Sequence, residues 1–143
     1  DSILFEQFDD LGPFDPGKDV LSDRRGLDKL IKKISAQIRN NHHLCFMIIA
    51  GKADKRSLKK PLQNRYRENI ALAQRRAAWV RQNLIDEKIP GVEAEKLVPI
   101  ATGPEIIDKK EDDESTAPDR IVRCYALWAK KSGTEETQPL KEK

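Results

Sequence analysis

The sequence predicts an α/β (α+β) sandwich, with helices packed on a mixed sheet and the element order β-α-β-α-β-β. Apolar runs of strand length occupy 44–50, 98–102 and 121–129. Two longer segments, over 22–39 and 65–87, carry apolar residues at helical spacing. A length of 143 residues, without an internal repeat, fits one domain better than two.

The chain is expected to open with a lead-in segment over 1–13, which ends in the turn signal Gly12-Pro13. The residues from Phe14 to Gly17 and Val20-Leu21 then predict a short strand or a turn leading to a helix. Ser22 is the expected N-cap of that helix, with Asp23 in its first turn.

The first helix is expected to span about five turns and to end at Asn40-Asn41. Its apolar stripe consists of Leu27, Leu30, Ile31, Ile34 and Ile38. The uninterrupted apolar run from Leu44 to Ala50 predicts a central strand covered on both faces, which Gly51 ends. His42 and His43, which precede this strand, are expected to be solvated loop residues.

The second half of the chain repeats the alternation of helix and strand. A basic loop interrupted by Pro61 is expected over 52–64, and a helix from about Arg65 to Glu87 follows. The buried stripe of this helix would be Ile70, Ala73, Ala77, Val80, Leu84 and Ile85. A short turn over 93–97 and a strand over 98–102 come next, and then a long acidic loop over 104–118.

The last strand, over 121–129, has an alternating pattern that places four residues on one face: Val122, Cys124, Ala126 and Trp128. Residues 131–143 are polar and are expected to form a disordered tail.

Charge and hydropathy exclude several classes of function. Apolar residues make up 38% of the chain, enough for one modest core, and the net charge of +3 is too small to indicate nucleic-acid binding. No apolar run approaches the roughly 20 residues that span a bilayer. Because residue 1 is Asp and no signal peptide is visible, we expect a processed or excised chain, with any membrane anchor outside it.

The sequence contains no pattern typical of catalysis. It lacks the serine-hydrolase, zinc-protease, phosphate-loop and dinucleotide motifs, and its two cysteines do not form a zinc-binding motif. Cys45 and Cys124 lie in strand-like runs; two buried, reduced thiols are the simpler interpretation, and a disulfide stays open. We therefore predict that the protein is not an enzyme, and we expect no metal or cofactor.

Polar side chains gather where predicted strands end and helices begin, which is where open α/β sheets bind ligands. Asp54 follows the central strand, and Arg75 and Arg76 lie beside the apolar stripe of the second helix. Asp119 and Arg120 directly precede the last strand.

These segments resemble the OmpA C-terminal-like family of peptidoglycan-binding domains, of the OmpA, Pal and MotB types. In that family a strand ends in a Gly-His-Thr-Asp type motif, a helix reads Asn-x-x-Leu-Ser-x-x-Arg-Ala-x-x-Val, and the last strand opens with Asn/Asp-Arg-Arg-Val. This chain has Gly51-Lys52-Ala53-Asp54, the helix Asn69 to Val80, and Asp119-Arg120-Ile121-Val122. Phe14 to Gly17 resembles the family's first-strand segment, so the domain is expected to cover 14–130.

The resemblance implies that Asp54 and Arg76 bind the diaminopimelate of the peptidoglycan stem peptide. The planar fork of Arg matches a carboxylate, and an ionised Asp suits an ammonium group. Asn69, Leu72 and Arg120 occupy motif positions that shape or border the pocket. The simpler alternative for Asp54 and Arg76 is an ion pair without a ligand.

The chain also departs from the family's pattern. Lys52-Ala53 replaces His-Thr, Ala73 replaces Ser, and Ile121 replaces Arg. The strongly basic segment 55–67 is longer than usual and would overhang the pocket, either as a solvated insertion or as a contact to anionic wall polymer. A degenerate domain that serves protein interaction or dimerisation without wall binding is therefore the alternative.

By resemblance, the chain would lie in the periplasm and anchor a membrane protein or complex to the cell wall. The parent would be an outer-membrane protein, a lipoprotein, or a MotB-like stator subunit of an ion-driven motor or phage-defence machine. Attachment to the inner or outer membrane would come from a segment outside this chain. Peptidoglycan is the expected partner, nucleic acid is not expected, and a homodimer is left open.

Overall fold

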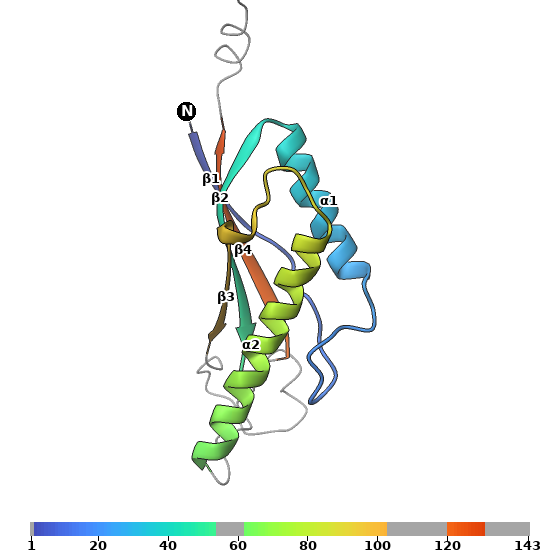
Figure 1. Cartoon of the computed structure of the whole chain (residues 1–143), viewed down its shortest axis with the longest axis vertical. Helices are drawn as coiled ribbons and strands as arrows, with labels where there is room; N and C mark the ends of the chain where they lie inside the picture. Colours follow the sequence, from blue (N-terminus) through green and yellow to red (C-terminus); the bar gives the residue numbers. More distant parts are fainter. Residues whose placement is uncertain (1, 54–61, 103–119, 131–143) are drawn as a thin grey trace, which may run out of the picture.

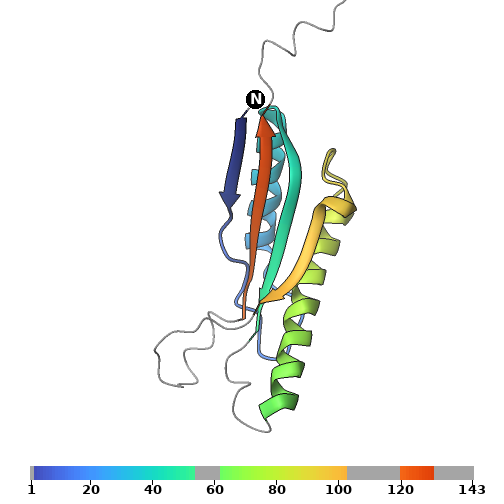
Figure 2. The same ribbon diagram turned by 90° about the vertical axis from the view of Figure 1, so that its left-hand side faces the viewer.

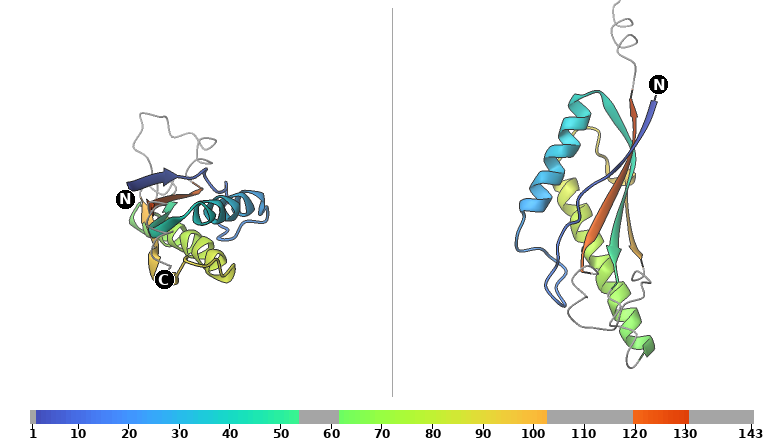
Figure 3. Two further views of the ribbon diagram at one scale, coloured as in Figure 1. Left: turned by 90° about the horizontal axis from the view of Figure 1, so that it is seen from above. Right: turned by 180° about the vertical axis from the view of Figure 1, so that it is seen from behind.

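A computed structural model describes residues 2–53, 62–102 and 120–130, with the backbone alone over 62–67. Within these ranges the order of strands and helices is β-α-β-α-β-β, as predicted. The strands form one sheet in the order β1-β4-β2-β3, in which β2 and β3 are parallel and the other two pairs are antiparallel. Both helices pack on the same face of the sheet (Figures 1 and 3), which confirms the predicted sandwich with a mixed sheet.

Strand β1 (Ser2–Gln7) lies in the segment that was predicted to be a lead-in. It pairs with β4 (Val122–Lys130) at one edge of the sheet, and Phe8 and Leu11, which follow it, are buried in the core. The alternative prediction of a strand in Phe14 to Gly17 was wrong, because these residues belong to the connection between β1 and the first helix. The lead-in is thus part of the sheet and the core.

Helix α1 (Arg25–Arg39) begins later than predicted. Ser22 is not its N-cap: Arg24 occupies that position, and no side chain caps it. The Asp23 carboxylate instead accepts the backbone N–H of Arg25 at 3.0 Å. Asn40 ends the helix as predicted, and the predicted apolar stripe packs on the sheet, with Leu27, Leu30 and Ile34 buried and Ile31 and Ile38 partly buried.

Strand β2 (His42–Lys52) is longer than predicted and includes both histidines, which were wrongly expected in a loop. His42 is half-buried, and its ring lies edge-on to Trp128 with the centroids 6.3 Å apart. The helices cover only one face of β2, since Met47 is fully buried whereas Phe46 is 40% exposed. The prediction of a strand covered on both faces was therefore wrong.

The two cysteines have different surroundings. A β-bulge interrupts the pairing of β2 with β4 between Leu44 and Phe46, and Cys45 at the bulge is exposed. Cys124 lies on the helix-covered face of β4, where burial raises the pKa of its thiol to about 12. Both thiols are free. The prediction of two buried reduced thiols is thus right for Cys124 and wrong for Cys45.

Helix α2 (Leu62–Asp86) begins earlier than predicted, so residues 62–64 belong to the helix rather than to the basic loop. Its predicted stripe is confirmed at the four fully buried residues, Ala73, Ala77, Val80 and Leu84. The helix lies so close to β2 that a Cβ on Gly51 would fall on the backbone carbonyl of Ala73. The small residues at these two positions therefore bring the first half of α2 against the end of β2.

The remaining described elements follow the prediction closely. A 3-10 turn (Ala94–Lys96) leads into β3 (Leu97–Thr102), and the predicted face of β4 is buried under the helices. Residues 54–61 of the predicted basic loop, the acidic loop and the C-terminal tail lie outside the described residues. None of the described helices has the length and hydropathy needed to cross a membrane.

Candidate functional site

The centre of the candidate site is Arg76, whose side chain is only 2% exposed. Its Nε donates a hydrogen bond of 2.8 Å to the backbone carbonyl of Lys18. Its Nη2 donates one of 3.2 Å to the carbonyl of Asp15. Both acceptors lie in the connection between β1 and α1, so Arg76 fastens this connection to α2.

The Arg76 guanidinium lies over the ring of Phe14. This ring is 1% exposed, and the guanidinium carbon of Arg76 lies 5.1 Å from the ring centroid. A cation at this distance from an aromatic face is stabilised by about 1–2 kcal/mol when desolvated. Trp79 of the same helix contacts the Phe14 ring edge-on at 6.1 Å. Sequence reasoning missed Phe14 as a site residue; an aromatic directly before Asp15-Pro16-Gly17 was the available signal.

Arg120 forms two hydrogen bonds with the backbone of Phe14. Its Nε donates to the carbonyl of Phe14 at 2.8 Å, and the Phe14 N–H donates to the carbonyl of Arg120 at 2.7 Å. Gly12 has a φ of +126°, and a Cβ at this position would come within 2.8 Å of the Arg120 carbonyl, so this approach requires glycine. Arg76 and Arg120, predicted from separate segments, thus both contact Phe14.

Asn69 and Leu72 lie on the same face of α2 as Arg76, because the three residues follow the i, i+3, i+7 spacing of a helix. Both are half-buried. The structure therefore groups the predicted helix residues on one side of α2. Asp54, the predicted partner of Arg76, and Asp119 lie outside the described residues.

The two neighbouring cations have different environments. The Arg75 side chain is 57% exposed and pairs with Asp19 at 3.4 Å, an exposed contact that contributes little, as expected for a solvated neighbour. Lys52, which replaces the family's His, is 9% exposed at the end of β2. Over the described ranges, Lys52 and Arg76 are the buried charged residues. The register of β2 places Lys52 on the sheet face opposite α2, so Lys52 and Arg76 lie on different faces of the sheet.

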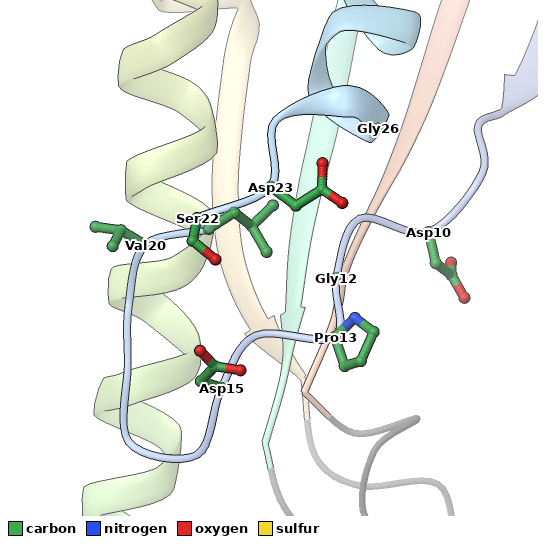
Figure 4. A pocket seen from close by; sticks show the side chains of 9 residues that line it. Asp10, Gly12, Pro13, Asp15, Val20, Ser22, Asp23 and Gly26 are labelled. Atoms are coloured by element: carbon green, nitrogen blue, oxygen red, sulfur yellow. The ribbon is translucent and has the colours of Figure 1, made fainter.

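A hollow of about 200 Å³ opens on the connection between β1 and α1 (Figure 4), and Asp10, Asp15 and Asp23 contribute to its lining. Arg123 binds the Asp10 carboxylate at 2.6 and 3.0 Å. Arg25 binds Asp23 through its side chain and backbone and lowers the pKa of that carboxyl to about 2. Two of these three carboxylates are therefore already paired. Where the chain is described, no group of three or more His, Cys, Asp or Glu residues could hold a metal ion.

No protein-family model and no curated protein matches this chain. Among solved structures, it is similar to the OmpA-like domain of FopA1 from Francisella tularensis, with a TM-score of 0.60 and 14% identity over 91% of this chain and 77% of that one. It is also similar to the peptidoglycan-associated lipoprotein from Burkholderia pseudomallei, with a TM-score of 0.51 and 22% identity over 81% and 86% of the two chains.

A third similar structure is a MotB-like protein from Desulfovibrio vulgaris, with a TM-score of 0.50 and 20% identity over 91% of this chain and 75% of that one. At these identities the likeness is one of fold. The chain has the fold of OmpA-like domains of the Pal and MotB types, as its sequence motifs predict.

Proposed function

We propose that this chain is a non-enzymatic domain that binds peptidoglycan non-covalently, with Arg76 recognising a carboxylate of the diaminopimelate stem peptide. The observation that carries the proposal is the fixed guanidinium of Arg76, which is buried, stacked on Phe14 and bonded to two carbonyls. Fixing a planar fork before the ligand arrives lowers the entropic cost of binding a carboxylate.

The similar structures support this proposal. One is by name a peptidoglycan-associated lipoprotein, and another is a MotB-like protein. In the proposed complex, Asp54 accepts the ligand ammonium, and Asn69, Leu72 and Arg120 border the ligand. The domain would work in the periplasm and anchor a lipoprotein, an outer-membrane protein or a MotB-like stator complex, including one of a phage-defence machine, to the wall.

A second candidate function is a protein-interaction module that keeps the fold without wall binding. A specific observation favours it: Arg76 is 2% exposed, and its Nε and Nη2 already donate to the carbonyls of Lys18 and Asp15. In this case Arg76 would serve only to fasten the connection between β1 and α1 to the second helix.

Co-sedimentation with purified sacculi separates the two candidates. We expect the wild-type chain to pellet with sacculi and Arg76→Ala to bind at least tenfold more weakly, since hydrogen bonds to charged groups contribute about 1.5–3 kcal/mol. Arg76→Lys, which keeps the charge but loses the fork, should also bind weakly. Arg75→Ala is the matched control, an exposed neighbour of the same charge on the same helix, and should bind as wild type does.

Two further measurements make the result specific. Thermal unfolding identifies variants that remain folded at the assay temperature, because Arg76→Ala also removes contacts to the connection between β1 and α1. A soluble stem peptide containing diaminopimelate should release the bound chain, and the same peptide with lysine in its place should not. A wild-type chain that stays in the supernatant, or a folded Arg76→Ala that binds equally well, would contradict the proposal.

A further inference from the structure

Helix α1 carries a concentration of positive charge on the side that points away from the sheet. We define this cationic face of α1 by five exposed residues, Arg25, Lys29, Lys32, Lys33 and Arg39. Four of them follow spacings of four, three and seven residues, which places them opposite the apolar stripe of the helix. Figure 2 looks onto the strands and shows both helices behind them, so the cationic face lies on the outer surface of the molecule.

The charge of this face is a local excess and does not follow from the composition of the chain. The whole chain is nearly balanced, with 27 Lys and Arg residues against 24 Asp and Glu residues. The exposed residues of α1 nevertheless include five cations and one anion, Asp28. Helix α2 is different, because its exposed residues from 68 to 86 include one cation, Arg75, and two anions, Glu68 and Asp86. The outer surfaces of the two helices therefore suit different partners.

The protein itself neutralises little of this charge. Arg25 pairs with Asp23 and Lys33 with Asp9, at N–O distances of 2.7 and 3.7 Å, and exposed pairs of this kind contribute little. The other three cations form no ion pair with any described residue. Like charges on one side of a helix repel each other, and an anionic partner would relieve this repulsion.

The cationic face is long and contains no apolar side chain. From Arg25 to Arg39 the helix axis extends about 20 Å, at 1.5 Å per residue. A shallow hollow at the Arg25 end is lined by Asp23 and Asp28 as well as by three of the cations, so the excess of positive charge is greatest towards Arg39. The apolar stripe of α1 is buried against the sheet and cannot insert into a bilayer. A membrane would therefore meet only the charged groups of α1, at the level of the lipid headgroups.

We propose that the cationic face of α1 docks on the anionic phospholipid headgroups of a membrane surface. Each Lys or Arg close to an anionic bilayer raises the affinity about fivefold, so several cations on one straight helix suffice for reversible binding. A single helix on the outer surface presents its whole length to a flat partner, whereas a linear polymer is held best in a groove. The proposal does not rest on wall binding, because Arg76 is buried on the other helix.

Flotation of the full chain with phospholipid vesicles tests the proposal. We expect the wild type to float at low salt with phosphatidylcholine vesicles that contain about 30% phosphatidylglycerol, and to stay unbound without the anionic lipid or at about 0.5 M salt. Lys32→Glu combined with Arg39→Glu should weaken binding at least about 25-fold, since two cations are removed at about fivefold each. The matched control is Arg75→Glu combined with Lys88→Glu, which changes the net charge equally at exposed positions outside α1 and should bind as wild type does.

Lysine acetylation read by mass spectrometry gives a second readout on the unmutated chain. Vesicles should slow the reaction at Lys29 and Lys32 and leave that at the exposed Lys88 unchanged. Arg76→Ala, if folded, should float as wild type does, so the failure of either proposal leaves the other standing. A wild type that does not float, a folded α1 variant that floats equally well, or protection confined to Lys88 would overturn the proposal. Tighter binding per phosphate to soluble polyphosphate would also overturn it, since the partner would then be a linear polyanion.

Discussion

The two faces of the sheet differ sharply although they share the same strands. On β4, Val122, Ala126 and Trp128 are completely buried under the helices, while the alternate residues Tyr125 and Leu127 remain partly exposed. One face therefore has a close-packed core, and the other has apolar side chains without comparable cover. An apolar strand sequence therefore does not reveal which face of the strand is buried, because that depends on where the helices pack.

The largest difference between the faces should appear on truncating neighbouring residues of β4. Trp128→Ala removes a fully buried ring whose Nε1 donates to Glu6 at 3.1 Å, and should lower the free energy of unfolding by about 3–5 kcal/mol. Leu127→Ala, on the sheet face opposite the helices, should lower the free energy of unfolding of the monomer by about 1 kcal/mol or less. Urea denaturation at low micromolar concentration measures both; equal losses would refute the contrast.

The approach of α2 to β2 should make Gly51 intolerant of a side chain. Gly51→Ala would place a methyl group on the carbonyl of Ala73 and should cost about 1–3 kcal/mol as the helix moves away. Gly26→Ala is the control, because Gly26 lies in α1, where a Cβ meets only the Leu11 side chain at 3.4 Å. It should leave stability unchanged or raise it by up to about 1 kcal/mol. Tolerance of Gly51→Ala would show that the helix is free to move.

Thiol chemistry offers a milder comparison of the two faces. At pH 8 a thiol reagent should modify one cysteine per folded chain, Cys45, and both after denaturation. Burial, together with the negative charge of Asp10, raises the pKa of Cys124 to about 12 in the folded chain. As pH rises, the thiol of the unfolded chain therefore ionises at a lower pH than the thiol of the folded chain. Its contribution to stability is therefore complete below about pH 8.5 and declines as pH rises towards 12. Rapid reaction of both thiols in the folded chain would place Cys124 outside the core.

The smallest effect is expected at the start of α1, outside both faces. The side-chain and backbone hydrogen bonds from Arg25 lower the pKa of Asp23 to about 2. The contribution of this carboxylate is present above its ordinary pKa of about 3.9 and is lost as pH falls through 2. NMR titration should find the low pKa in the wild type and a normal one in Arg25→Gln. An unchanged pKa in the variant would exclude Arg25 as the cause.

The sequence predicts most of the elements correctly where the periodicity is strong. The apolar stripes of both helices and the alternation of β4 are confirmed. These elements could be predicted because a long amphipathic element repeats its burial pattern often enough to be recognised. Arg76 and Arg120 were predicted from the family resemblance; both contact Phe14, and their role in binding stays a prediction.

The rest depends on contacts between distant segments. Strand β1 is short and lies at the edge of the sheet, so none of its residues is fully buried and no burial pattern marks it. The role of Phe14 arises only when α2 brings Arg76 over its ring. The run from Leu44 to Ala50 lacks polar residues altogether, so its sequence cannot distinguish the covered face from the exposed one. Such features are set by tertiary packing, which local periodicity does not record.

The pairing of β1 with β4 has a consequence for how the chain folds. Ser2 pairs with Lys130, and β1 has no other neighbour among the described strands. Strand β1 must therefore wait until β4, which lies more than 100 residues later in the chain, is synthesised before it can join the sheet, and contacts of such long sequence separation slow folding. Until then the apolar residues from Ile3 to Phe5 stay available to chaperones, or to a neighbouring nascent chain. Loss of β4 would thus also leave β1 without its partner in the sheet.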